Sequence, residues 1–408
     1  MRCASSPAPT FGPWLQPGRR STCCVAAAPR LQRVSGTLCV ISPGRLATTR
    51  DGRVQVDPKT AAGMERYATS WPGDVHFVAR AGEVDERSQP FDWPRPQDLA
   101  FDVSFTDDTA TTVRGIAPRT VLAPLELENA ELLGLGLPCA LVSDYPLRVR
   151  WDNVRLDPRL SSVDRARTAV GLSRRGVLLR RMIRRADGLQ CNGLDTYATY
   201  AGLSRSPLLY FDTRVTDAQV ASAGAAAPPP ADTLRLAFSG RWIEQKGVLD
   251  AVRVTKQLHD DGIPVRLSLL GGGPLEDQLC ADPHPAVRVL GRLDFASQWV
   301  PFVRDEVDLM VLPHPQGDSA STFLESMSCG TPVAGYDNRY WRSLQAESGG
   351  GWLSAAASAD LAELVGSLAA DLTEVARTRQ AGLEFAAGHT FEREFDRRVQ
   401  HLLSIGAS

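Results

Sequence analysis

The stretch VDLMVLPHPQGDSASTFLESMSCGTPVAGY, residues 307–336, decides the fold class of this chain. Residues 309–312 form a continuous apolar run, which is typical of a parallel strand covered on both faces. Pro313 ends that strand, and Gly330 with Pro332 ends a short helix before a second apolar strand begins. The order strand, polar loop, helix, strand predicts an α/β protein built on parallel sheets.

The polar loop before this helix predicts the kind of ligand. Ser319, Ser321 and Thr322 are candidates to cap the helix, whose free amides would then face the carboxyl edge of the sheet. Glu325 lies about one turn inside the helix. Amides at a helix N-terminus stabilise phosphate, and a carboxylate one turn further on can accept hydrogen bonds from ribose hydroxyls. The stretch therefore predicts a nucleoside diphosphate bound at this edge.

Length and composition set the limits for every further inference. With 408 residues, two domains are expected, each large enough for its own core. The net charge of -2 gives no reason to expect a nucleic-acid partner. The sequence contains no run of about 18 apolar residues, so no membrane span is predicted. The eight cysteines show no CxxC pair and no spacing typical of a metal site, so we expect reduced cysteines and a cytoplasmic protein.

Composition divides the chain into five parts. The arginine-, proline- and alanine-rich start lacks periodicity, and we expect it to be disordered. The sequence ASAGAAAPPPAD is expected to form a linker rather than a helix. The predicted parts are a disordered segment at 1–35, a first Rossmann-like domain at 36–220, the linker at 221–232, a second, nucleotide-binding domain at 233–387, and a C-terminal helix at 388–408 that packs back on the first domain.

Short apolar segments alternate with helical patterns in both halves, which predicts doubly wound parallel sheets. Helices are expected at 60–70, 164–186, 247–260, 275–279 and 391–403. The predicted strands are 37–41, 75–79, 99–105, 120–122, 140–143, 188–191 and 208–211 in the first half, and 234–239, 265–270 and 287–290 in the second, ahead of residues 307–336.

The first motif of the second half is FSGRWIEQKG, residues 238–247. Arg241 and Lys246 lie between a strand end and a helix start, where two cations would neutralise a departing diphosphate. The chain has only three lysines, the others being Lys59 and Lys256, so Lys246 marks a position that favours a compact ammonium. The alternative is that both side chains are solvated loop charges.

Two further motifs follow strands of the same half. Consecutive glycines in LLGGGPL, residues 269–275, allow the backbone to approach a ligand, although a tight turn alone would also explain them. Asp318 and Glu325 could likewise be an ordinary loop residue and an ordinary helix carboxylate. All three motifs lie at strand-to-helix junctions, which line one edge of an open parallel sheet. This shared placement favours a ligand site over three separate structural explanations.

Taken together, the second half resembles the nucleotide-binding domain of retaining glycosyltransferases of the GT-B fold, family 4. The matching segments are GRWIEQKG at 240–247, GGGPL at 271–275, VLGRL at 289–293 and PHPQGDSASTFLESMSCGTPV at 313–333. The resemblance implies two Rossmann-like domains that face a cleft, with the active site between them.

The resemblance also implies roles for particular residues. Arg241 and Lys246 would grip the diphosphate as catalytic groups, and Glu325 would bind the ribose. Amides around Ser321 and Thr322 would meet phosphate or the transferred sugar. The donor nucleotide-binding set implied by these motifs is Gly240, Gly272, Arg292, Ser321, Thr322 and Glu325.

One departure from the family pattern concerns the sugar end of the site. The family places a first glutamate eight residues before the second, and Gly317 occupies that position here. Asp318 lies next to it and is the candidate catalytic carboxylate that would contact the donor sugar through a reshaped loop. Loss of the first acid could also mean altered donor choice or lost activity.

The first half matches the family weakly. Ser42-Pro43-Gly44 is expected in the loop after the first strand, where the family often carries glycines that face donor phosphate and acceptor, so Gly44 is assigned to the acceptor side. Asp144 follows a predicted strand and is assigned to the same side. The basic helix at 164–186 could rest on anionic lipid at the inner face of the membrane, or it could simply have a solvated arginine face.

The resulting functional hypothesis is a retaining glycosyltransferase. It would move a sugar from a nucleotide-diphosphate sugar to a glycan, lipid-linked or small-molecule acceptor, with no metal and no cofactor, as in polysaccharide biosynthesis. Two alternatives stay open. One is a nucleotide-sugar epimerase or hydrolase of the same fold, and the other is a non-catalytic sugar-nucleotide binder, which is considered because Gly317 replaces the first acid.

Overall fold

The computed structural model describes most of the chain after the N-terminal segment. Residues 1–35, which we expected to be disordered, lie outside the described residues, and so do residues 226–232 of the expected linker. The described residues belong to one compact unit, Ser35–Ser408. They are 36–49, 52–82, 94–157, 159–225 and 233–406.

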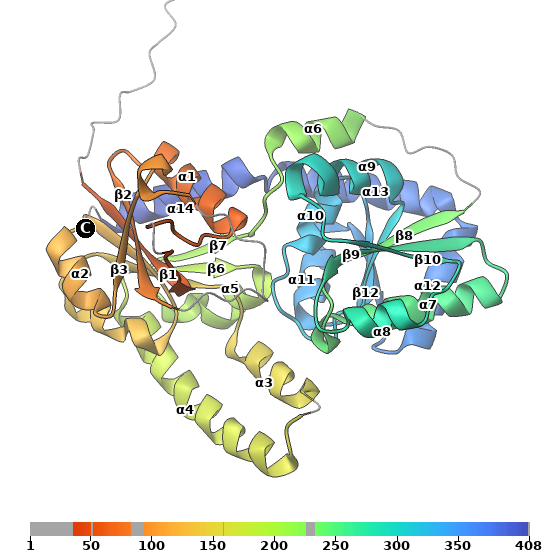
Figure 1. The fold of residues 1–408 in the computed structure, drawn as a ribbon, viewed down its shortest axis with the longest axis horizontal. Coiled ribbons are helices and arrows are strands. Elements are labelled where there is room, and N and C mark those ends of the chain that lie inside the picture. Colours follow the sequence, from red (N-terminus) through yellow and green to blue (C-terminus); the bar gives the residue numbers. More distant parts are fainter. Residues whose placement is uncertain (1–35, 50–51, 83–93, 158, 226–232, 407–408) are drawn as a thin grey trace, which may run out of the picture. The chain divides into compact units, whose positions relative to one another are not determined.

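The first sheet has seven parallel strands in the order β3-β2-β1-β4-β5-β6-β7 (Figure 1). The order reverses between β1 and β4, which is the switch point of a doubly wound sheet. Its strands are β1 (Leu38–Leu46), β2 (Val75–Ala81), β3 (Asp102–Thr106), β4 (Thr120–Pro124), β5 (Cys139–Ser143), β6 (Gly188–Asn192) and β7 (Pro207–Tyr210). The helices connecting them are α1 (Pro58–Ser70), α2 (Thr109–Ile116), α3 (Leu147–Leu156), α4 (Ser162–Arg185) and α5 (Leu194–Tyr200), with α6 (Asp217–Ala225) after β7.

The second sheet has six parallel strands in the order β10-β9-β8-β11-β12-β13, with its switch point between β8 and β11. The strands are β8 (Leu234–Arg241), β9 (Val265–Gly272), β10 (Val287–Gly291), β11 (Leu309–Leu312), β12 (Val333–Tyr336) and β13 (Gly351–Ser354). The helices are α7 (Val248–Asp260), α8 (Glu276–Ala281), α9 (Val300–Glu306), α10 (Thr322–Ser328), α11 (Arg339–Ser348), α12 (Ser358–Ala370), α13 (Leu372–Ala387) and α14 (Phe391–Ile405).

The stretch that decided the fold class forms the elements it predicts. β11 and β12 pair in parallel and are fully buried, and β11 also pairs with β8 in the middle of the sheet. The apolar run of 309–312 is explained by this position, because helices cover both faces of a central parallel strand. The helix between them, α10, ends at Ser328 and has Cys329 as its C-cap. The next residue, Gly330, adopts a φ of 74° that favours glycine.

The last helix, α14, covers the first sheet. Phe395, Val399 and Leu402 belong to the same core cluster as Leu38 of β1. The ring of Phe395 packs edge-on against that of Tyr67 on α1, with 4.9 Å between the ring centroids. The chain therefore returns to its first sheet after completing the second one.

Three local expectations differ from the structure. Residues 221–225 are helical as the end of α6, because Val220 and Ala223 of this helix are buried in a small cluster with Leu383. β1 continues through Leu46 with a register irregularity between Ile41 and Arg45, so residues 42–44 lie within the strand rather than after it. The strand expected at 99–105 begins only at Asp102.

Candidate active site

A pocket of about 240 Å³ lies at the carboxyl edge of the second sheet. The ends of β8 and β9, the loop after β10 and the first turn of α10 form its walls. Because these segments follow different parallel strands, the sheet brings their residues to one edge. Six of the residues predicted for the donor side line this pocket: Gly240, Arg241, Gly272, Arg292, Thr322 and Glu325.

The glycine run explains how β8 and β9 approach each other here. Gly271 has a φ of 131°, and an added Cβ would lie 1.9 Å from the carbonyl oxygen of Gly240, so no other residue fits. A Cβ on Gly272 would lie 3.0 Å from Nε of Arg292. Gly271 is thus required by the packing of β8 against β9, whereas the missing side chain of Gly272 leaves room for Arg292 at the pocket wall.

Glu325 is almost completely buried, with 1% of its surface exposed, and it forms a two-point ion pair. Arg214 donates to both carboxylate oxygens, with Nε at 2.9 Å from Oε1 and a terminal nitrogen at 3.1 Å from Oε2. Burial would lower the pKa of Arg214, but the Glu325 carboxylate outweighs that effect and raises it. The guanidinium carbon also lies 3.6 Å from the ring centroid of Phe295, and both side chains line the pocket.

Arg214 was not found by sequence reasoning. It follows β7 in the segment FDTRVTD, where no motif distinguishes it from the chain's many other arginines. It lies 111 positions before Glu325, so only the fold shows the contact.

Lys246 and Asp318, the other two predicted catalytic residues besides Arg241, bind each other. Nζ of Lys246 donates to both carboxylate oxygens of Asp318, at 2.8 and 2.7 Å. His314 lies 4.0 Å from Asp318, but burial and the charge of Lys246 lower its pKa well below the usual value, so the imidazole is neutral. Lys246 is therefore the cation that balances Asp318, and neither residue of this pair is among those lining the 240 Å³ pocket.

Gly317, which replaces the first acid of the family pattern, is not required by the backbone. Its φ is not in the positive range that favours glycine. An added Cβ would lie 3.4 Å from its nearest atom, the backbone nitrogen of Tyr340. That is an ordinary contact distance. Gly317 lines a separate pocket of about 500 Å³ together with His314 and Arg339.

The prediction that a serine or threonine side chain caps α10 is wrong. Ser321 occupies the cap position with helical φ and ψ of -58° and -25°, and no side-chain cap bond is formed. The hydroxyl of Ser319 instead donates to the backbone carbonyls of Asp144 and Asn192, and Nζ of Lys59 lies 3.5 Å from Oγ of Ser321. Contacts with the first domain hold these serine side chains.

The two residues assigned to the acceptor side differ in position. Gly44 is exposed within the irregular end of β1, and its amide donates to Oγ of Ser42 at 3.3 Å. Asp144 directly follows β5 and lines a second pocket, in which Pro43 rather than Gly44 takes part. Burial, with Asp212 nearby, raises the pKa of Asp144, although its carboxylate remains accessible from the pocket.

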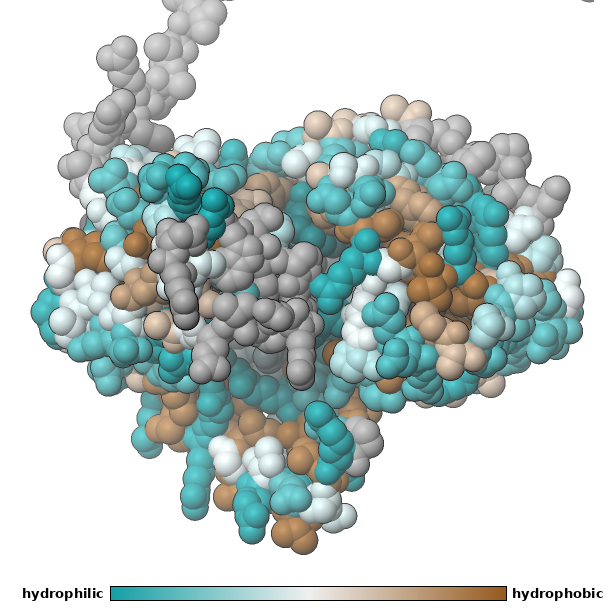
Figure 2. All heavy atoms as spheres, in the orientation of Figure 1, coloured by the Kyte–Doolittle hydropathy of each residue, from teal (hydrophilic) through white to brown (hydrophobic). Residues whose placement is uncertain are grey.

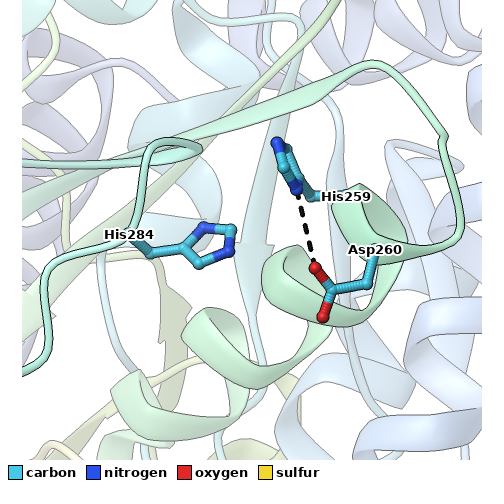
Figure 3. Close-up of side chains that lie close together, drawn as sticks. All are labelled: His259, Asp260 and His284. Carbon is cyan, nitrogen blue, oxygen red and sulfur yellow. Dashed lines mark ion pairs between the residues drawn. The ribbon is translucent and has the colours of Figure 1, made fainter.

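Among the described residues, one group could offer three metal ligands: His259, Asp260 and His284, whose ligand atoms lie within 4.8 Å of one another (Figure 3). His259 and Asp260 end α7, and His284 precedes β10, so the group lies at the amino edge of the second sheet. The pocket lies at the opposite, carboxyl edge. This group is therefore not part of the candidate donor site.

Comparison with protein families shows which domain the second half contains. Residues 233–371 match the family described as Glycosyl transferases group 1, and the chain therefore carries a domain of that group. A curated relative, the 2-deoxystreptamine N-acetyl-D-glucosaminyltransferase of Streptomyces fradiae, is 28% identical over 221 residues, which are 50% of this chain and 48% of the relative. The match thus spans about half the length of that relative.

Solved structures show the same architecture over most of the chain. HepE of Anabaena, determined with UDP and glucose, has a TM-score of 0.56 at 13% identity, covering 90% of this chain and 99% of its own. Sucrose-phosphate synthase of Thermosynechococcus elongatus has a TM-score of 0.59 at 14% identity, with 90% and 98% covered. Trehalose 6-phosphate synthase of Burkholderia multivorans has a TM-score of 0.60 at 12% identity, with 91% and 97% covered. The predicted fold, two Rossmann-like parallel-sheet domains of the GT-B type, is confirmed.

Proposed function

We propose that this protein is a glycosyltransferase that moves a sugar from a nucleoside-diphosphate sugar to an acceptor with retention of the anomeric configuration. The observation that carries the proposal is the pocket at the carboxyl edge of the second sheet, where Arg241, Arg292, glycine backbone and Glu325 line one cavity. The group 1 domain over residues 233–371 supports the transferase class. Retention rests on the resemblance of the motifs to the retaining family.

In this proposal the diphosphate lies between the two arginines. Bond breakage leaves negative charge on the diphosphate, and fixed cations stabilise that charge without a metal. Asp318 holds the ammonium of Lys246 beside the pocket until the donor enters, and the diphosphate then competes for it. Glu325 binds the ribose hydroxyls from the wall of α10.

The proposal also concerns the acceptor. The name of the Streptomyces relative describes N-acetyl-D-glucosaminyl transfer to 2-deoxystreptamine, which supports a small acceptor over a polymer. Donors of N-acetylglucosamine and small cyclic acceptors therefore belong in the first panel to be tried.

An incubation with a panel of nucleotide sugars and acceptors tests the proposed function. Transferred sugar, free sugar and epimerised donor are quantified separately. We expect acceptor-dependent transfer to exceed free-sugar release, and to persist in EDTA because Arg241 and Arg292 carry the charge. Free sugar or epimer as the main product would support the hydrolase or epimerase alternative, and nucleotide binding without any product would support a non-catalytic binder.

We further propose that α4 makes a peripheral contact with anionic lipid. None of the described helices has the length and hydropathy needed to cross a membrane. Val163, Val170 and Val177 are 67%, 55% and 53% exposed and recur every seven residues, so they share one helix face. Exposed arginines lie among them, including Arg174 and Arg181. Figure 2 shows the mixture of hydrophobic and hydrophilic residues over the region of α3 and α4.

Liposome flotation checks this contact. We expect the protein to float with vesicles containing anionic lipid and not with neutral vesicles. The apolar side chains that insert into the lipid and the arginine charges both contribute to binding. Val170→Asp combined with Val177→Asp is expected to remove flotation while leaving turnover of soluble substrates unchanged. Equal flotation with neutral and anionic vesicles, or none with either, would contradict the proposal and favour a solvated helix face.

A further inference from the structure

The first domain contains a second pocket, of about 220 Å³, at the carboxyl edge of its sheet. Residues of β1, β2, β4 and β5 and of the end of β7 line it, together with α1 and α14. Much of the lining is apolar, contributed by side chains such as Ile41, Met64, Val142 and Phe395. Lys59, Asp144, Asp212 and Arg398 add two basic and two acidic side chains. An apolar floor with a few polar groups is typical of a small-molecule site.

This second pocket lies directly beside the donor pocket. Asp212 lines the second pocket and Arg214 lines the donor pocket, and the two residues are two positions apart on the segment after β7. Two residues of extended chain span only about 7 Å. Lys59 of the second pocket also lies 3.5 Å from Oγ of Ser321, which precedes α10 of the donor site. A molecule in the second pocket would therefore be next to a donor sugar.

The two carboxylates of the second pocket are in opposite electrostatic situations. Asp212 forms an ion pair with Lys59. Burial alone would raise the pKa of Asp212, but Lys59, with Arg398 and Arg214, holds it below the usual value. Asp144 has no ion-pair partner within the described part of the chain, and its side chain accepts only a 3.3 Å hydrogen bond from the Tyr210 hydroxyl. Burial, reinforced by Asp212, raises the pKa of Asp144.

The other cation of the pocket is already engaged. Nε of Arg398 donates to Gln190 at 2.8 Å, and its guanidinium carbon lies 4.3 Å from the ring centroid of Tyr210. With Lys59 held by Asp212, Asp144 is the carboxylate that lacks a close counterion. A carboxylate that lacks a counterion in a largely apolar pocket is stabilised by a cation that the ligand supplies.

Tyr67, one of the residues that line the pocket, has an unsatisfied hydroxyl group. The oxygen of Tyr67 is buried and has no hydrogen-bond partner among residues 36–49, 52–82 and the other described ranges. Buried hydroxyl groups are normally hydrogen-bonded, so this one points to a polar group of a ligand. Asp144 and Tyr67 together favour a ligand that carries a cationic group and a further hydrogen-bonding group, such as a hydroxyl group.

We propose that this pocket binds the acceptor and that Asp144 pairs with an ammonium group on it. The acceptor is then a small cyclic molecule that carries both amino and hydroxyl groups. The volume of about 220 Å³ is below the range of about 300–1,000 Å³ for pockets that hold drug-sized ligands, so a single ring fits better than an oligosaccharide. This inference rests on the proposed transferase function, because that function supplies the neighbouring donor.

Binding of matched probes tests the proposal without any donor. The probes are glucosamine with glucose, and aminocyclitols with the cyclitols that have hydroxyl groups in place of the amines, measured by calorimetry or ligand-observed NMR. We expect an amine to bind wild type at least about tenfold more tightly than its hydroxyl counterpart, because a charge-assisted hydrogen bond is lost in the counterpart. In Asp144→Asn the preference should disappear, whereas the exposed control Asp98→Asn should keep it.

Several outcomes would overturn the proposal. If no amine is preferred by wild type, or if the preference survives in Asp144→Asn, Asp144 does not bind an ammonium group. The wild-type comparison decides the question even if the variant is unstable. If Asp144→Asn lowers transfer to amine and hydroxyl acceptors by the same factor, Asp144 has a general role and the proposal is wrong.

Failure of this inference can be told apart from failure of the proposed function. If amines are preferred but no nucleotide sugar supports transfer, the transferase proposal fails and the amine site stands. If transfer occurs equally well to amine-free rings, the transferase proposal stands and the amine site fails.

Discussion

Replacing Arg214 by alanine is expected to lower the free energy of unfolding by about 2–4 kcal/mol, because the change leaves a buried carboxylate without its cation. Glu325 is only 1% exposed, and both of its oxygens accept from Arg214. The expected loss is at the lower end of the range for buried pairs because the Arg214 side chain is 34% exposed. Chemical denaturation followed by circular dichroism measures the change.

Two further variants separate the effect of charge from that of packing. The double variant Arg214→Ala with Glu325→Gln should recover much of the lost stability, since it leaves no unpaired charge in the interior. Arg266→Ala, which removes an exposed arginine 3.9 Å from the exposed Glu306, is the matched control and should cost less than about 1 kcal/mol. An Arg214→Ala variant as stable as this control would show that the Glu325 pair is not needed for the fold.

Replacing Lys246 by alanine is expected to lower the rate of sugar transfer by about 100-fold or more, comparable with the loss of one donor to a developing oxyanion. The reason is that Lys246 supplies positive charge to the leaving diphosphate in the proposed mechanism. Initial rates with saturating donor and acceptor measure the effect. Lys256→Ala, on α7 and paired with the exposed Asp282, is the control and should retain the wild-type rate.

The Lys246–Asp318 contact allows a structural role to be excluded. If Lys246 only neutralises Asp318, then adding Asp318→Asn to Lys246→Ala should restore activity along with stability. If Lys246 acts on the diphosphate, the double variant stays slow even when it is folded, whereas the single variant Asp318→Asn, which keeps the Lys246 ammonium, stays faster than the double variant. A single variant within a few-fold of the wild-type rate would remove Lys246 from the mechanism.

The sequence predicted the fold well because burial leaves a local pattern. The run of 309–312 is typical of a strand covered on both faces, and it pairs with β8 and β12 in the middle of its sheet. The pattern was less informative where tertiary contacts decide the conformation. Residues 221–225 are poor in helix signals, yet they extend α6 because Ala223 is buried against Leu383.

The residues predicted for the donor side come together where they follow successive strands of one sheet. Parallel topology brings Gly240, Gly272, Arg292 and Glu325 to the same edge. The partners of these residues were not predictable. Arg214 is separated from Glu325 by 111 positions, and only the fold shows that it forms an ion pair with this carboxylate.

The second pocket could not be inferred from sequence for the same reason. Lys59 and Asp212 are separated by 153 positions, and Arg398 lies on the last helix. No motif links these three residues, and the electrostatic contrast between Asp144 and Asp212 depends on which of them Lys59 contacts. Sequence reasoning placed Asp144 on the acceptor side but gave no chemistry for it.

The most direct measurement of the central claim is the transfer reaction itself, followed by proton NMR at the anomeric position. The protein is incubated with nucleotide sugars and cyclic acceptors, and the product signal is compared with that of the donor. The account predicts a new glycoside, formed together with free nucleoside diphosphate, whose anomeric configuration is that of the donor. A glycoside of inverted configuration would contradict the retaining mechanism, and the absence of any glycoside across the panel would contradict the transferase assignment.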